Sequence, residues 1–131
     1  MLRTIEQILR DSKTIAVVGL SADPMRPSYG VSEYMQSRGY RIIPVNPKEP
    51  EVLGEKSYAR LEDIPEPVDI VNVFRRPAQT PEVARAAVAI GAKALWLQED
   101  IINEEAREIA EAGGLDVIMD RCILIEHRRL R

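Results

Sequence analysis

The sequence of 131 residues contains one cysteine, Cys122, and one histidine, His127. One cysteine excludes a disulfide within the chain, and one cysteine with one histidine is too small a set for a zinc or iron–sulfur site made by this chain alone. No segment approaches the roughly 18 consecutive apolar residues of a membrane-spanning helix. The first residues, 1–10, carry charges where a signal peptide has its apolar stretch. We therefore expect a cytoplasmic protein that does not bind membranes.

Basic residues are too few for a protein dedicated to nucleic acids. The chain has 18 Lys and Arg against 21 Asp and Glu, a formal net charge of −3. Because nucleic-acid binding draws much of its affinity from Lys and Arg on phosphates, we expect no nucleic-acid partner. A chain of 131 residues fits one domain and leaves no room for a second, substrate-binding domain.

Five short apolar runs predict buried β-strands. The segments between them are long enough for a helix that returns the chain to the start of a parallel neighbour. The runs occupy residues 14–20, 41–45, 69–74, 93–97 and 116–119.

Capping residues and glycine stop signals predict helices between most of these strands. Thr4 and Gln7 form a capping box before an apolar stripe. Between the second and third strands, two prolines break any long helix, and only residues 57–64 carry a weak helix signal. The other predicted helices begin at Ser28, Thr80 and Asn103 and end at Gly39, Gly91 and Gly113.

This alternation predicts a single-domain α/β fold over residues 1–131, a three-layer Rossmann-like architecture with a five-stranded parallel sheet. The default strand order, numbered along the chain, is 3-2-1-4-5 with right-handed crossovers. In such sheets, ligands bind outside the carboxyl ends of the strands, where the strand order reverses. Residues that follow the strands are therefore the candidates for a functional site.

The segment from Gly19 to Gly30, after the first strand, has features of a phosphate-binding loop. Gly19 lets a ligand approach the backbone, and a helix that starts near Ser28 offers unpaired N–H groups with a partial positive charge. Arg26 adds a full charge. The spacing is not Gly-x-Gly-x-x-Gly, because Ser21 stands where the second glycine would be. Alternatively, Gly19 only permits a tight strand exit and Ser28 only caps a helix.

Residues after the second strand separate classes of cofactor. Sites for NAD place an Asp or Glu there to accept hydrogen bonds from the ribose, whereas this chain has Asn46, Pro47 and Lys48. Lys48 would attract a phosphate on the ribose, a group that both NADP and coenzyme A carry. Alternatively, Lys48 is an exposed loop charge.

After the third strand, Phe74, Arg75 and Arg76 put an aromatic ring and two guanidinium groups at the same edge. Arginine binds phosphate through two hydrogen bonds and stacks on rings, so these residues are further candidates. We also expect at least one of the three to serve the core or a surface ion pair. Trp96, at the end of the fourth strand, favours a core position.

Cys122 is the candidate nucleophile, although most lone cysteines in small cytosolic domains are inert core residues. His127 is expected at a solvated helix end. The sequence contains no Ser-His-Asp arrangement, paired-carboxylate motif or metal-ligand spacing.

Taken together, these segments resemble the small stand-alone CoA-binding proteins, whose domain is similar to the nucleotide-binding domain of the succinyl-CoA synthetase α subunit. One departure is that family members usually have a glycine just after Trp-x-Gln, where this chain has Glu99 and Asp100. The resemblance covers residues 15–127, and its most specific pieces are Val-Val-Gly-Leu-Ser at 17–21, Arg-Pro-Ser-Tyr-Gly at 26–30, residues 39–48, Asp-Ile-Val-Asn-Val-Phe-Arg-Arg at 69–76, Trp-Leu-Gln at 96–98 and Asp-Arg-Cys at 120–122.

The resemblance implies coenzyme A or acyl-CoA in the cleft. Pro47 and Lys48 would lie beside the adenosine and its 3′-phosphate, and Phe74, Arg75 and Arg76 would line the other wall. The residues that would hold the pyrophosphate are Gly19, Ser21, Arg26, Pro27, Ser28, Tyr29 and Gly30.

Our leading hypothesis is a CoA-binding module without catalysis of its own, because the chain is one domain without an acid–base set. The synthetase-type reaction would also need a phosphorylated histidine from another domain. We expect a homodimer or a separate catalytic partner protein. The alternatives are a thiol-based acyl carrier or CoA-disulfide redox protein that uses Cys122 and, with less support, an NADP-binding reductase.

Overall fold

The computed structural model describes residues 2–130, in which strands and helices alternate as the sequence predicts. No helix in this range is long and apolar enough to span a membrane. The parallel strands are β1 (Thr14–Val18), β2 (Arg41–Val45), β5 (Ile70–Val73), β6 (Ala94–Leu97) and β7 (Asp116–Ile118). The helices are α1 (Ile5–Asp11), α2 (Pro27–Ser37), α3 (Thr80–Ala89), α4 (Glu104–Ala112) and α5 (Ile123–Arg128), with single 3-10 turns η1 (Leu61–Asp63) and η2 (Pro77–Gln79) and a small hairpin of β3 (Glu51–Val52) and β4 (Glu55–Lys56).

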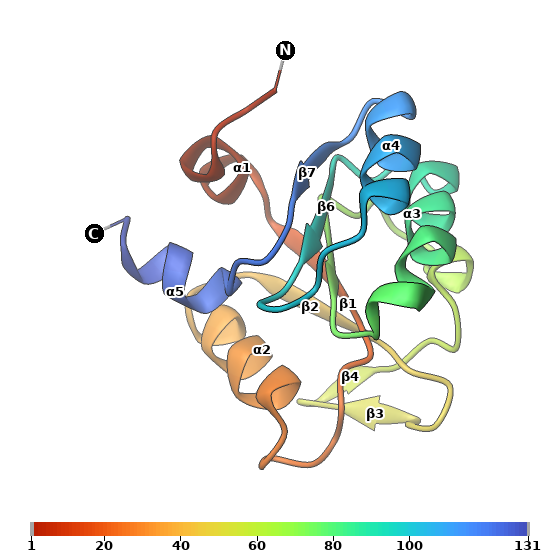
Figure 1. Cartoon of the computed structure of the whole chain (residues 1–131). Helices are drawn as coiled ribbons and strands as arrows, with labels where there is room; N and C mark the ends of the chain where they lie inside the picture. The colour runs from red at the N-terminus through yellow and green to blue at the C-terminus, as the bar shows by residue number, and fades with distance from the viewer. Residues whose placement is uncertain (1, 131) are drawn as a thin grey trace.

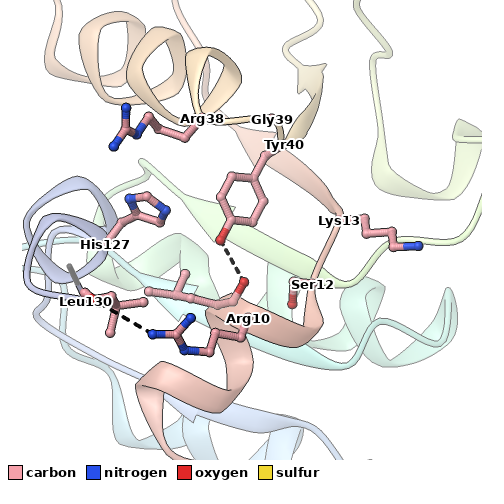
Figure 2. A pocket seen from close by; sticks show the side chains of 9 residues that line it. Arg10, Ser12, Lys13, Arg38, Gly39, Tyr40, His127 and Leu130 are labelled. Carbon is pink, nitrogen blue, oxygen red and sulfur yellow. Dashed lines mark hydrogen bonds between the residues drawn. The ribbon is translucent and has the colours of Figure 1, made fainter.

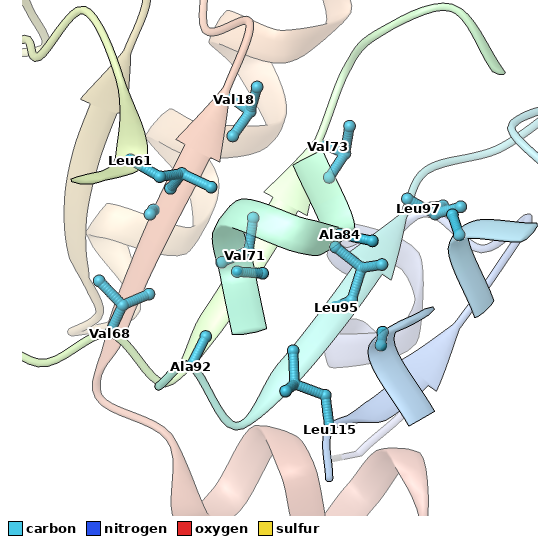
Figure 3. Packing of buried hydrophobic residues seen from close by; sticks show 14 of the residues in the cluster. Val18, Leu61, Val68, Val71, Val73, Ala84, Ala92, Leu95, Leu97 and Leu115 are labelled. Atoms are coloured by element: carbon cyan, nitrogen blue, oxygen red, sulfur yellow. The ribbon is translucent and has the colours of Figure 1, made fainter. Parts of the chain in front are cut away.

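Helices cover both faces of the sheet (Figure 1). On one face, buried alanines of α3 and α4 pack in a cluster with Val71, Leu95 and Leu97 (Figure 3). On the other face, side chains of α1, α2 and α5 pack in a cluster with Ile70 and Trp96. The predicted α/β class and three-layer architecture are therefore confirmed.

Two helices begin where capping predicts. Thr4 Oγ1 accepts a hydrogen bond from the Gln7 N–H at 3.1 Å, and Gln7 Oε1 accepts one from the Thr4 N–H at 2.8 Å. At the start of α4, Asn103 Oδ1 accepts from the backbone N–H three residues later at 2.9 Å. Each bond satisfies an N–H that has no partner within its helix.

The predicted strand order was wrong. The sheet runs β2-β1-β5-β6-β7, which is 2-1-3-4-5 for the five parallel strands numbered along the chain. Pro44 supplies the physical reason, because it lies within β2 and lacks the N–H that a central strand would donate on one side. β2 is accordingly an edge strand, and its outer side carries a single bridge in which the Tyr58 N–H donates to Pro44 O at 3.0 Å.

The observed order moves the point of reversal to the gap between β1 and β5. The Gly19 N–H donates to Val45 O of β2, and the Phe74 N–H donates to Val18 O of β1, both at 2.9 Å. Gly19 has a φ of 89°, and a Cβ there would collide with the carbonyl oxygen of Phe74. The loops after β1, β2 and β5 therefore diverge from one point, where the backbones of β1 and β5 are in close contact.

The helices α1, α2 and α5 end together at the opposite, amino edge of the sheet, around a cavity of about 460 Å³ (Figure 2). Tyr40 lies at its centre, and its hydroxyl donates to Leu9 O at 2.6 Å. Arg10 and Arg38 also line it. Cationic side chains stabilise the partial negative charge at helix carboxyl ends, so this basic cluster has a structural explanation.

His127 belongs to this cluster and is half-buried, which corrects the prediction of a solvated helix end. Its Nδ1 lies 2.9 Å from the Tyr34 hydroxyl, and its ring meets the rings of Tyr34 and Tyr40 edge-on at centroid distances of 5.5 and 5.7 Å. Burial, and then the charge of Arg38, lower the pKa of His127.

We expect Gly19→Ala to destabilise the protein by about 2 kcal/mol more than Gly114→Ala. Gly114 has nearly the same φ, 88°, but a Cβ there meets nothing within 4 Å. The control therefore contains only the backbone cost of a left-handed alanine, about 1–2 kcal/mol. Urea unfolding of both variants measures the difference, and equal losses would show that the Phe74 contact is unimportant.

We expect the unfolding temperature to fall as pH is lowered from 8 to 5.5. The unfolded chain protonates His127 near its ordinary pKa of about 6.5, whereas the folded protein resists protonation. The contribution of His127 to the free energy of unfolding is therefore fully present above about pH 6.5 and is lost as pH falls toward the lower folded-state pKa. His127→Gln should flatten the profile in this range, and an unchanged slope in that variant would assign the effect to another group.

Candidate functional site

Six of the predicted residues meet in one cavity at the carboxyl edge of the sheet, beside the contact between the ends of β1 and β5. The cavity measures about 240 Å³. It is open to solvent at the start of α2, on the face of the sheet that α2 covers. Its lining residues are Gly19, Ser21, Arg26, Pro27, Ser28 and Phe74, and we call it the phosphate pocket.

The first turn of α2 faces this pocket without a side-chain cap. Its N-cap residue, Arg26, makes no capping bond, and the turn contains no acidic residue. Every other α-helix in residues 2–130 has a side-chain cap, an acidic residue in its first turn, or both. The partial positive charge at the start of α2 is therefore left for an anion from outside the chain.

The loop between β1 and α2 is held by its own side chains. The Ser21 N–H donates to Ser28 Oγ at 3.0 Å, Ser21 Oγ accepts from the Asp23 N–H at 3.0 Å, and Asp23 Oδ1 accepts from the Met25 N–H at 2.9 Å. Ser28 was predicted as the N-cap, but the N-cap is Arg26, two residues earlier, and the Ser28 hydroxyl fixes the loop instead. The pocket is thus formed without a ligand.

Asn46 ties the loop after β2 to the loop after β1. Its Nδ2 donates to Leu20 O at 3.0 Å, and its Oδ1 accepts from the Lys48 N–H at 3.0 Å. Pro47 and Lys48 are both exposed at the same edge. Sequence reasoning missed Asn46, although asparagine commonly makes this turn with the N–H two residues later.

A second cavity, of about 430 Å³, lies on the other face of the sheet beside the same contact between β1 and β5. Val18 and Val45 line it from the strands, and Arg75 lines it from the loop after β5. Arg60 and Leu61, from the segment after the hairpin, close the opposite side. These two were not predicted, because that segment follows a hairpin whose turn contains a left-handed leucine rather than a recognisable turn dipeptide.

The remaining predicted residues lie outside these two cavities. Tyr29 packs against the core from α2, and Gly30 is an exposed helical residue. Arg76 is exposed before η2. Cys122 is the half-buried N-cap of α5, without a capping bond. Trp96 is fully buried, as expected, and its Nε1 donates to Arg121 O at 2.8 Å.

Asp100 lies in the segment where the resemblance leads us to expect a glycine. Its φ of 68° is left-handed, a conformation that asparagine and aspartate tolerate better than most residues. The Asp100 N–H donates to Asp120 Oδ1 at 2.7 Å, and Asp120 is itself left-handed, with a φ of 57°. This bond joins the loops after β6 and β7. The substitution therefore keeps the turn and adds negative charge at this end of the edge.

Residues 2–130 contain no group of three or more His, Cys, Asp and Glu side chains that could hold a metal ion. The phosphate pocket is lined by backbone and hydroxyl groups, the Phe74 ring and the cationic side chain of Arg26. That chemistry suits a phosphorylated organic ligand.

The chain is similar to several proteins of known sequence or structure. The chain is 50% identical over 123 residues to the uncharacterized protein YneT of Bacillus subtilis (strain 168), covering 94% of this chain and 91% of that protein. A hypothetical protein from Pyrococcus horikoshii OT3 has a TM-score of 0.94 at 41% identity, with 96% of this chain and 89% of that chain covered.

A larger relative is the ADP-forming acetate–CoA ligase II of Archaeoglobus fulgidus, 29% identical over 101 residues. The alignment covers 76% of this chain and 15% of the ligase. A sequence model of the CoA binding domain matches residues 13–128. The chain therefore belongs to the CoA binding domain family.

Proposed function

We propose that this protein binds coenzyme A or acyl-CoA at the carboxyl edge of the sheet, over the ends of β1 and β5, and has no catalytic activity of its own. The pyrophosphate would lie in the phosphate pocket, and the 3′-phosphate would lie near Lys48. The observation that carries the proposal is the uncapped start of α2, which faces a preformed pocket beside Gly19 and Arg26.

The charges at this edge support a ligand with several phosphates. Although the chain has a net charge of −3, the loops after β1, β2 and β5 contribute Arg26, Lys48, Arg75 and Arg76. Guanidinium groups and helix N-termini both bind phosphate oxygens well. The missing side chain of Gly19 leaves room for the Phe74 carbonyl, and this close contact keeps the starts of these loops together.

The second cavity supports the place proposed for the adenosine. Its apolar side chains, Val18, Val45 and Leu61, offer a surface for a base, and Arg60 and Arg75 offer guanidinium planes that stack on rings. Asn46 holds the loop of Lys48 beside this cavity through its bond to Leu20. A base there would place the ribose between Lys48 and the phosphate pocket.

The positions of the reactive groups support binding without turnover. The sole histidine, His127, belongs to the cluster at the amino edge, across the sheet from the phosphate pocket. Cys122 has no histidine beside it that would serve as a base, so its use as an acyl carrier stays a prediction. Any ligase or transfer step would need a separate catalytic partner.

Titration calorimetry with CoA and NADP tests the choice of ligand. We expect CoA to bind and NADP to bind at least about tenfold more weakly, because the loop after β1 lacks the glycine spacing of dinucleotide sites. NADP binding without CoA binding would overturn the proposal and favour a reductase.

We expect Lys48→Ala to weaken CoA by about 10- to 100-fold and to leave 3′-dephospho-CoA nearly unchanged. The loss corresponds to one hydrogen-bonded charge pair of about 1.5–3 kcal/mol. Lys93→Ala is the matched control, because Lys93 is an exposed lysine before β6, at the other edge of the sheet. Equal losses for both ligands would remove Lys48 from the 3′-phosphate site.

A further inference from the structure

Four buried polar side chains belong to α2 or to the face of the sheet that α2 covers. Ser28, Ser32, Asn72 and Gln98 are only 5%, 1%, 1% and 4% exposed. Ser28 has a clear role, because its hydroxyl accepts from the Ser21 N–H. The other three take no part in the site described above, although burying polar groups is costly.

Asn72 and Gln98 form a pair on the face of the sheet that α2 covers. Asn72 shares that face with Ile70, since side chains alternate along β5. Gln98 follows β6 and shares the face with Trp96 in the same way. Gln98 Nε2 donates to Asn72 Oδ1 at 2.7 Å, in a buried hydrogen bond.

This bond leaves much of the hydrogen-bonding capacity of the pair unused. Each side-chain amide has an oxygen that accepts and an NH₂ group that donates. Whichever way the two amides are assigned, one free oxygen and at least one free N–H remain. Ser32 Oγ, also buried, has no hydrogen-bond partner among residues 2–130. Among the fully buried side-chain nitrogen and oxygen atoms of residues 2–130, Ser32 Oγ alone is unpaired, and such an atom calls for a partner from outside the chain.

The pair lies next to the phosphate pocket, on the side away from Lys48. Phe74 lines that pocket and follows Asn72 by two residues on the same face, a step of about 7 Å along a strand. Gln98 lies one strand further on, because β6 neighbours β5, whereas Lys48 follows β2 at the opposite edge of the sheet. Ser32 lies one turn along α2 from Ser28, which also lines the pocket.

We propose that Asn72 and Gln98 bind an amide group of the pantetheine arm of CoA, and that Ser32 adds a hydroxyl to the same subsite. A secondary amide presents a carbonyl oxygen and an N–H, which complement the free N–H and oxygen of the pair. The inference rests on the proposed function. With the 3′-phosphate near Lys48 and the pyrophosphate at α2, the pantetheine arm extends toward β6.

Calorimetry with CoA and with adenosine 3′-phosphate 5′-diphosphate, which keeps the phosphates of CoA and lacks only the pantetheine arm, isolates this subsite. In the double variant Asn72→Leu/Gln98→Met, apolar side chains of similar size replace both amides, so neither is left unpaired. We expect CoA affinity to fall about tenfold or more, while the affinity for the arm-free nucleotide changes less than about twofold. Thr80→Val, at a fully buried residue on the other face, is the control and should leave the ratio of the two affinities unchanged.

A merely structural role for the pair predicts a changed unfolding temperature with an unchanged ratio of affinities, and that result would overturn the proposal. If the double variant does not fold, the wild-type protein still decides, because the subsite requires it to bind CoA at least about tenfold more tightly than adenosine 3′-phosphate 5′-diphosphate. Equal wild-type affinities would exclude the subsite. Wild-type protein that binds neither ligand would instead refute the proposed function, and the subsite with it.

Discussion

The close approach of Gly19 to the carbonyl of Phe74 determines how the carboxyl edge of this sheet is built. β1 is hydrogen-bonded to a neighbour on each side up to its last residue, through Val45 O and the Phe74 N–H. A side chain at position 19 would push β5 away from β1. Because the two strands stay in contact, the loops after β1, β2 and β5 separate from one point. The phosphate pocket opens on one side of that point and the second cavity on the other.

Most of the fold was predictable because its signals are local. Capping residues such as Thr4 and Asn103, and apolar runs bounded by glycine, fix where elements begin and end. The strand order is a tertiary property, and the default order ignored Pro44, whose missing N–H favours an edge position. In the observed strand order, Phe74 lies next to Gly19, whereas the predicted order would have put the fourth strand beside β1.

The parts of the site that could not be predicted depend on backbone conformations that no sequence pattern indicates. Leu53 and Asp100 have φ values of 56° and 68°, which are normally left to glycine. The hairpin at Leu53 replaces an expected irregular segment and carries the chain toward Arg60 and Leu61. Asp100 is stabilised by a carboxylate twenty residues away along the chain, so a glycine pattern could not reveal that its turn is kept.

Charge is divided along this edge in a way that matches an asymmetric ligand. Arg26 lines the phosphate pocket, Arg75 lines the second cavity, and Lys48 is exposed in the loop after β2. Asp100 and Asp120, by contrast, meet beyond β6. Coenzyme A carries its phosphates at the nucleotide end and has an uncharged pantetheine arm. Carboxylates beyond β6 would cost such an arm little, but they would repel an acyl group that carries its own carboxylate. In the proposed binding mode, Asp100 and Asp120 would therefore favour a thiol or an uncharged acyl group at the far end of the site.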